Sequence, residues 1–188
     1  MRVNHLLNRA ESLARRLLPA LFAEMNRTGH AGHCIYVSRV IDLVFNEYGV
    51  RSEPLCVDFE FANASAIQQM AEGRALEPPA MIAKTGSETF DGYLHHVVTL
   101  VRDGPMALLL DPTIIQLERH LLDVTIPPVM ITLPWPRVDP LLVDIGGGCL
   151  TYSFRPRDEV FKTNEQWSDL SDAKARAAAV LRQMNSGS

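Results

Sequence analysis

Apolar residues recur at steps of three and four along the N-terminal part of the chain, which predicts an amphipathic helix. Pro19 interrupts this run, because proline disfavours helical geometry at the residue before it and can itself begin a helix. We therefore expect one helix that ends before Pro19 and a short new helix after it. The apolar positions are Leu6, Leu7, Ala10, Leu13, Ala14, Leu17, Leu21 and Phe22.

Two further helices follow from the same periodicity. One begins near Cys34, after a loop over residues 26–32, and presents two apolar ridges up to Tyr48. Gly49 then stands where a left-handed C-terminal cap is expected. The other is an alanine-rich helix over residues 171–184, with a serine at its start as the N-cap.

Strand patterns occupy the middle of the chain. Apolar and polar side chains alternate over residues 55–61, which is typical of a half-buried strand. Residues 96–101 are rich in β-branched side chains and precede Asp103-Gly104, a strong hairpin signal, so residues 106–110 are expected to return as the partner strand. A further strand is predicted at 149–154 after three glycines.

The intervening segments predict short or irregular structure. We expect a short helix at 63–72, a long loop at 73–93, one helical turn at 114–120, and an extended edge path through the prolines of 127–140. Taken together, the elements predict an α/β (α+β) fold in which N-terminal helices pack on an antiparallel β-sheet. We expect a single domain over 1–188, with a core of about 26–155 and the C-terminal helix appended.

Composition excludes several classes of protein. The chain has 18 Lys and Arg against 22 Asp and Glu and no basic stripe, so we expect no nucleic-acid partner. No segment reaches the ~18 uncharged apolar residues of a membrane helix, and charges at 11, 15 and 16 argue against a signal peptide. Three cysteines do not make a disulfide framework, which favours a reducing, cytoplasmic compartment. None of these features sets the oligomeric state.

Cys34 stands out because of its position at the start of the strongest predicted helix. Unpaired backbone N–H groups and the positive end of the helix dipole favour a thiolate there, and the same groups could hold an oxyanion. Read alone, the residue is more simply a buried small hydrophobe. Cys56 and Cys149 lie within predicted strands, where that simpler interpretation is stronger.

A nucleophilic cysteine needs a base and an orienting group, and the hairpin supplies both. If Asp103-Gly104 is a two-residue turn, His96 stands opposite Asp111 with Cβ atoms ~5 Å apart. A three-residue turn would instead bring His95 to the Asp111 face, because a shift of one residue reverses the faces. The pattern therefore favours His96 as the base and keeps His95 as the alternative.

These residues carry a resemblance to a known family. Segment 32–38, Gly-His-Cys-Ile-Tyr-Val-Ser, with its following apolar helix and Gly-Val, resembles the nucleophile helix of the transglutaminase-like, papain-like cysteine enzyme superfamily. His-Val-Val-Thr-Leu at 96–100 and Asp-Pro-Thr at 111–113 are similar to its histidine and aspartate strands. The resemblance implies a papain-like core with Cys34 as nucleophile, His96 as base and Asp111 as orienting acid. It departs from the family where Val98 replaces a frequent aromatic residue.

The side chain that would complete an oxyanion hole is not evident, since no upstream glutamine is present. Asn26, His30 and His33 are the possible substitutes. A zinc set drawn from His30, His33 and Cys34, with Cys56 or His95, is the competing hypothesis, but its spacing fits no common zinc motif. We therefore expect no metal and no other cofactor.

The sequence thus predicts thiol-dependent acyl chemistry on a peptide or amide, in which hydrolysis (a cysteine peptidase or amidase) is favoured because nothing marks a second-substrate site. The partner would be a peptide or protein substrate. Two alternatives stay open: an acyltransferase or transglutaminase, and a catalytically inactive peptide-binding module on the same fold.

Overall fold

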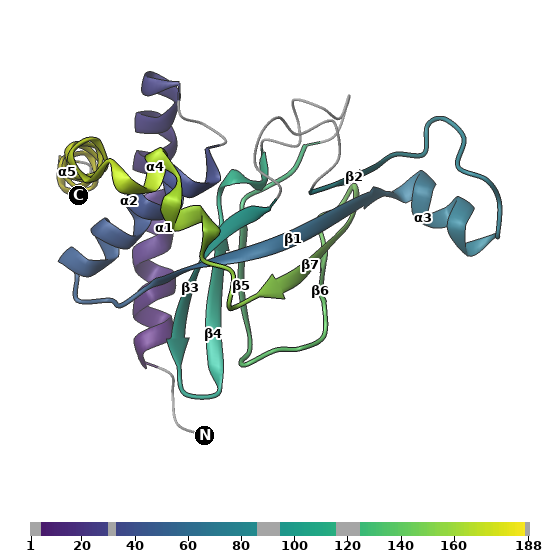
Figure 1. Cartoon of the computed structure of the whole chain (residues 1–188), viewed down its shortest axis with the longest axis horizontal. Helices are drawn as coiled ribbons and strands as arrows, with labels where there is room; N and C mark the ends of the chain where they lie inside the picture. The colour runs from purple at the N-terminus through teal and green to yellow at the C-terminus, as the bar shows by residue number, and fades with distance from the viewer. Residues whose placement is uncertain (1–4, 30–32, 86–94, 116–124, 187–188) are drawn as a thin grey trace.

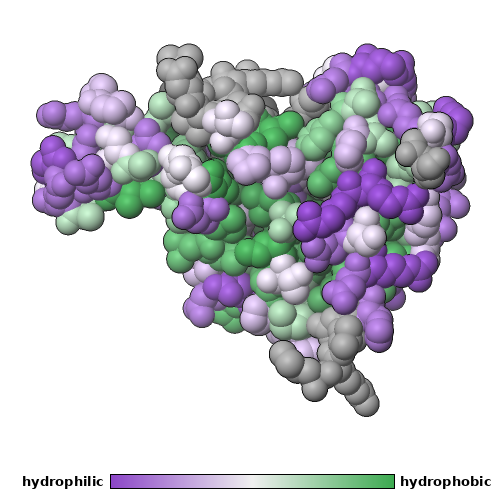
Figure 2. All heavy atoms as spheres, turned by 180° about the vertical axis from the view of Figure 1, so that it is seen from behind, coloured by the Kyte–Doolittle hydropathy of each residue, from purple (hydrophilic) through white to green (hydrophobic). Residues whose placement is uncertain are grey.

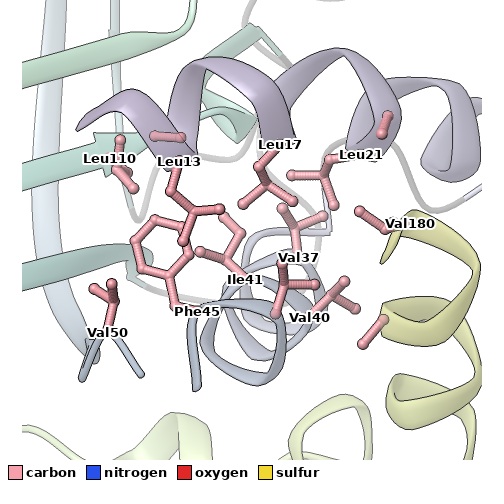
Figure 3. Close-up of a cluster of buried hydrophobic side chains, with 14 of the residues drawn as sticks. Leu13, Leu17, Leu21, Val37, Val40, Ile41, Phe45, Val50, Leu110 and Val180 are labelled. Carbon is pink, nitrogen blue, oxygen red and sulfur yellow. The ribbon is translucent and has the colours of Figure 1, made fainter. Parts of the chain in front are cut away.

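A computed structural model describes residues 5–29, 33–85, 95–115 and 125–186 (Figure 1). Three helices form a layer beside the sheet, and their apolar faces meet in one cluster. Figure 3 shows Leu13, Leu17 and Leu21 pointing toward the side chains of the second helix, with Val180 closing the cluster from the third. The helices are α1 (His5–Thr28), α2 (Cys34–Glu47) and α5 (Leu170–Ser186).

The expected break at Pro19 is wrong, because α1 runs through this residue without interruption. Proline removes one backbone N–H and crowds the carbonyl of Arg15, four residues earlier. Pro19 is exposed, as is Arg15, so water can reach that carbonyl. On the opposite side Leu17 and Leu21 are fully buried, and their packing outweighs the local preference against the helix.

The second helix agrees with its sequence pattern. α2 begins at Cys34 and ends at Glu47, and Gly49 adopts a φ of 64°. The Val50 N–H donates to the Phe45 carbonyl, and the Gly49 N–H donates to the Asn46 carbonyl. These two bonds satisfy carbonyls that the helix end would leave unpaired, so the glycine fixes where α2 stops.

The seven strands form one sheet in which every pairing is antiparallel. Their order is β5-β4-β3-β1-β7-β6, and β2 pairs with the far end of β1. The expected α+β class is therefore confirmed. The strands are β1 (Glu53–Asn63), β2 (Ile82–Lys84), β3 (His96–Asp103), β4 (Met106–Asp111), β5 (Val129–Pro134), β6 (Leu141–Asp144) and β7 (Gly148–Arg155).

The sheet separates two cores. Val101, Leu108 and Leu110 face the helices, whereas alternate residues of the same strands face a second apolar cluster. The sheet curls around this second cluster, which gathers side chains from β1, β3, β4, β5, β6 and β7. Figure 2 shows the molecule from behind, with apolar side chains at the centre and polar ones over the helical side. No described helix is long and apolar enough to cross a membrane.

The β3–β4 hairpin differs from expectation in its turn. Asp103 pairs with Met106, so the two turn residues are Gly104 and Pro105 rather than Asp103 and Gly104. Gly104 has a φ of 59°, which this tight closure requires. The register moves by two residues, and an even shift leaves every side chain on its expected face. Thr99 pairs with Leu110, so His96 stands diagonally from Asp111 rather than directly opposite.

Several short elements lie where loops or nothing regular were expected. β2 lies within the predicted loop 73–93, of which residues 86–94 are outside the described part of the chain, and β6 had no expected counterpart. The expected turn at 114–120 is described only as far as 115. The remaining elements are α3 (Ala64–Ala71), η2 (Val160–Thr163) and α4 (Glu165–Ser168). That the chain forms one domain stays a prediction.

Replacing Pro19 by alanine should stabilise the protein, because alanine restores one helical hydrogen bond at an exposed position. We expect a gain of about 1–3 kcal/mol in the free energy of unfolding, less than the full cost of an interior helical proline because α1 has already adapted. Urea denaturation measures it, with the exposed Arg16→Ala as the control that should change little. A loss of stability in Pro19→Ala would contradict this account of α1.

Candidate active site

The carboxylate of Asp111 lies at the end of β4, completely buried. Its Oδ2 atom accepts hydrogen bonds from His96 Nε2 at 2.9 Å and from the Tyr152 hydroxyl at 2.6 Å. Its Oδ1 atom accepts from the N–H and hydroxyl of Thr113, both at 3.1 Å, and from the Ile114 N–H at 3.0 Å. Five donors thus converge on one carboxylate from β3, β7 and the turn that follows β4.

These donors decide the charge of Asp111. Burial opposes ionisation, but the charge of His96 and the hydrogen bonds from His96, Tyr152 and Thr113 hold the pKa of Asp111 below its ordinary value. Burial and the charge of Asp111 together raise the pKa of Tyr152, so its hydroxyl keeps the proton that it donates. The site therefore holds a fixed negative charge.

His96 is 1% exposed and begins β3. The ring of Phe59 meets it edge to face, with centroids 5.3 Å apart, which restricts its orientation. Burial disfavours the imidazolium, but the charges of Asp111 and Cys34 and their hydrogen bonds raise the pKa of His96. Because Asp111 engages Nε2, the ring presents Nδ1 to Cys34.

Cys34 is the first residue of α2 and is partly exposed. The preceding residue, His33, makes no side-chain capping bond, and its carbonyl accepts the Val37 N–H of the first turn. The first N–H groups of α2 have no intrahelical partner, and the N-cap residue supplies no side-chain cap. Partial positive charge at this end of the helix favours an anion, either the thiolate or an oxyanion formed beside it.

The candidate residues predicted from the sequence thus fall into two groups. Cys34, His96 and Asp111 meet in one chain of hydrogen bonds. His95 points away, and its Nδ1 lies 2.7 Å from Asp58 Oδ1. This separation follows from the two-residue periodicity of a strand, which sends neighbouring side chains to opposite faces.

Two of the three side chains considered for the oxyanion hole belong to the described residues, and they lie on different elements. Asn26 belongs to α1, and His30 lies outside the described residues. His33 stands beside Cys34, with its Nδ1 atom 3.5 Å from Nε2 of Gln166 on α4. A glutamine amide therefore lies near the start of α2, although it comes from far downstream in the sequence.

Sequence reasoning also missed Tyr152 and Phe59. Tyr152 belongs to β7, which pairs with β1 and is separated from β4 in the sheet, so no local pattern connects it to Asp111. The available signal is the alternation of apolar and polar residues in β1 and β7. It places Phe59 and Tyr152, which are cross-strand partners, on the apolar face of the sheet. Neither residue carried a chemical motif of its own.

Comparison with known proteins gives no match to a family model, a curated protein or a solved structure.

The two shifted pKa values predict how Asp111→Asn changes stability with pH. The raised pKa of His96 stabilises the wild type fully below its ordinary value of 6.5 and progressively less as pH rises through the folded value. The lowered pKa of Asp111 stabilises it above 3.8 and less as pH falls through the folded value. The free energy of unfolding lost in Asp111→Asn should therefore be largest between pH 3.8 and pH 6.5, at about 3–5 kcal/mol. The loss should be smaller at alkaline pH.

Urea denaturation of both proteins from pH 4 to 10 measures this difference. Asp103→Asn, in the same hairpin, is the control and should follow the wild type throughout. A stability difference between wild type and Asp111→Asn that does not change with pH would show that no charge on His96 is coupled to Asp111.

Proposed function

We propose that this protein carries out thiol-dependent acyl chemistry on a peptide or amide, with Cys34 as nucleophile, His96 as base and Asp111 as orienting acid. The observation that carries the proposal is the continuous connection from an uncapped helix start, through Cys34 and a buried histidine, to a buried carboxylate with five donors. A nucleophile, a base and an orienting group in this order are the parts that acyl transfer needs.

The first half-reaction forms a thioester. His96 Nδ1 takes the proton of the Cys34 thiol, and the sulfur attacks the substrate carbonyl carbon. The carbonyl electrons move to oxygen, where first-turn N–H groups of α2 donate to the oxyanion. The oxyanion then collapses and the carbon–nitrogen bond breaks. His96 Nδ1 gives its proton to the leaving amine, while Asp111 holds Nε2–H and so keeps the ring in one orientation.

The second half-reaction releases the acyl group. A water gives its proton to His96 Nδ1 and adds to the thioester carbonyl, and the carbon–sulfur bond breaks to regenerate the thiolate with His96 protonated. An amine in place of water would make the same steps a transfer reaction. Hydrolysis is the proposal because the described residues show no built site for a second substrate.

The order of elements supports a transglutaminase-like, papain-like core for this chemistry. The nucleophile begins a buried helix, the base begins a strand, and the acid ends the neighbouring antiparallel strand. The partner in this proposal is a peptide or protein substrate. We keep a cytoplasmic location as part of the proposal, because all three cysteines are free thiols and free thiols are typical of a reducing compartment.

Alkylation kinetics test the nucleophile. Iodoacetamide should label Cys34 at least tenfold faster than Cys149 at pH 7, because a thiolate reacts and a thiol does not. Cys149 is the fair comparison, since both side chains are partly exposed, whereas Cys56 is buried. Peptide mapping after timed quenching measures each rate, and equal rates at Cys34 and Cys149 would remove Cys34 as nucleophile.

The same assay identifies the base. His96→Ala should slow alkylation of Cys34 at pH 6 by at least tenfold, because the thiolate loses its imidazolium partner. His95→Ala, the neighbouring histidine on the other face, should change the rate less than twofold. The reverse result would assign the base to His95, and no effect from either change would contradict the proposed group of three.

Acylation separates an enzyme from an inactive binding module. A p-nitrophenyl ester should acylate Cys34 and be turned over, as followed by released nitrophenol and by the mass of the protein. Asp111→Asn should reduce turnover by up to ~10⁴-fold, as in triads where this change disturbs the histidine tautomer. Asp103→Asn should retain full activity. A wild type that forms no acyl adduct at Cys34 would favour the binding module.

A further inference from the structure

A second group of potential ligands lies on the opposite face of the sheet from Asp111. Cys56 Sγ, one ring nitrogen of His95 and one carboxylate oxygen of Asp158 all lie within 4.8 Å of one another. The three residues come from β1, from the residue just before β3, and from the turn after β7, so the fold and not a local motif brings them together. None of them belongs to the proposed catalytic group.

Asp58 orients the imidazole of this group. Its Oδ1 atom lies 2.7 Å from His95 Nδ1, while its Oδ2 atom accepts from Arg155. The guanidinium of Arg155 beside Asp58 favours the anionic form of this carboxylate, which can therefore accept a hydrogen bond from the imidazole. A neutral His95 that donates Nδ1–H to this acceptor directs its Nε2 lone pair at Asp158. A histidine held in this way by a carboxylate is the usual arrangement of a metal ligand.

The carboxylate of Asp158 is also held in place by its neighbours. Its Oδ1 atom accepts the Val160 N–H at 3.0 Å, and its Oδ2 atom lies 3.5 Å from His95 Nε2. Nε2 of His95 and this carboxylate oxygen therefore face each other, and a cation between them would contact both.

The third potential ligand is a cysteine thiol. Cys56 is completely buried, beside Val97 on β3 and Arg155 on β7. Arg155 is the cross-strand partner of Cys56, and its guanidinium binds Asp58 beside this group. A buried thiol cannot reach a substrate carbonyl, but thiolate, imidazole and carboxylate are the three ligand types that zinc combines.

We propose that Cys56, His95 and Asp158 bind a zinc-like divalent cation, with Asp58 as the carboxylate that orients His95. Ligand atoms around tetrahedral zinc are roughly 3.3–3.8 Å apart, so the group must contract by about 1 Å at its widest. Asp158 lies in a turn, where such a shift is easier than in a strand. His95 and Asp158 are partly exposed, and His95 lines a surface groove of about 470 Å³, so two of the three ligands are accessible from solvent.

A metal ion bound at this site would connect three parts of the fold. Three protein ligands leave one position for water, and bound metal would tie the turn after β7 to β1 and to the start of β3. Because His95 precedes His96 directly, the same ion would also restrain the residue that begins β3. The site needs none of the chemistry proposed for Cys34, so either proposal can hold without the other.

Cobalt(II) and zinc(II) titrations of the full chain test this inference. In a Cys34→Ser background, Co(II) should bind in a 1:1 ratio with a thiolate-to-cobalt charge-transfer band and the intense visible bands of a tetrahedral site. Cys56→Ser should abolish the charge-transfer band. Asp158→Asn and Asp58→Asn should weaken binding by about 10- to 100-fold, the second because a metal-bound histidine loses its orienting partner. Zn(II) should raise the melting temperature of the parent and displace Co(II).

Cys149→Ser in the same background is the matched control and should bind Co(II) as the parent does. The partly exposed Asp158→Asn keeps the test valid if Cys56→Ser fails to fold. Absence of a charge-transfer band in the Cys34→Ser parent would overturn the proposal. So would a band that persists in Cys56→Ser, or an affinity that Asp158→Asn leaves unchanged.

Discussion

A single buried carboxylate organises the part of this structure on which the proposed chemistry depends. Asp111 lies where β4 ends, and an unpaired charge at that depth would be very costly. Its two oxygens are satisfied by β3 and β7 on one side and by the following turn on the other. The hydrogen bonds that make the charge tolerable also fix the His96 ring and the Tyr152 hydroxyl. Stability and orientation therefore have the same physical origin here.

The pleat of the strands explains why the pairing of His96 with Asp111 could be predicted from the sequence. The side of the sheet that a residue faces depends only on whether its position is odd or even relative to its partner strand, so the predicted hairpin could be wrong by two residues and still select His96. The start of α2 and its Gly49 cap were likewise readable, because helix ends follow local backbone requirements. Local rules were therefore sufficient to predict that His96 and Asp111 share one face of the hairpin.

Features that depend on packing between remote segments could not be predicted from local sequence patterns. Pro19 looks like a helix breaker in isolation, yet burial of Leu17 and Leu21 on the other side of α1 keeps the helix continuous. Tyr152 reaches Asp111 only because the sheet curls around its second apolar cluster, which brings β7 toward the end of β4. β2 and β6 are three and four residues long, too short for alternation to distinguish them from loops. In each case a contact between remote segments decides the local outcome.

The adjacent histidines show how one strand can serve two sites. His95, just before β3, and His96, its first residue, point to opposite faces, so His96 enters the apolar interior and His95 faces the partly exposed side. Each ring then meets its own carboxylate: Asp111 for His96, and Asp58 for His95. The buried ring is fixed and kept from water, which suits proton transfer to a thiol at a helix start. The other ring has a second carboxylate and a buried thiol within reach, which suits ligation of a cation. Burial and the neighbouring groups, rather than residue type, thus distinguish the roles that we propose for two consecutive histidines.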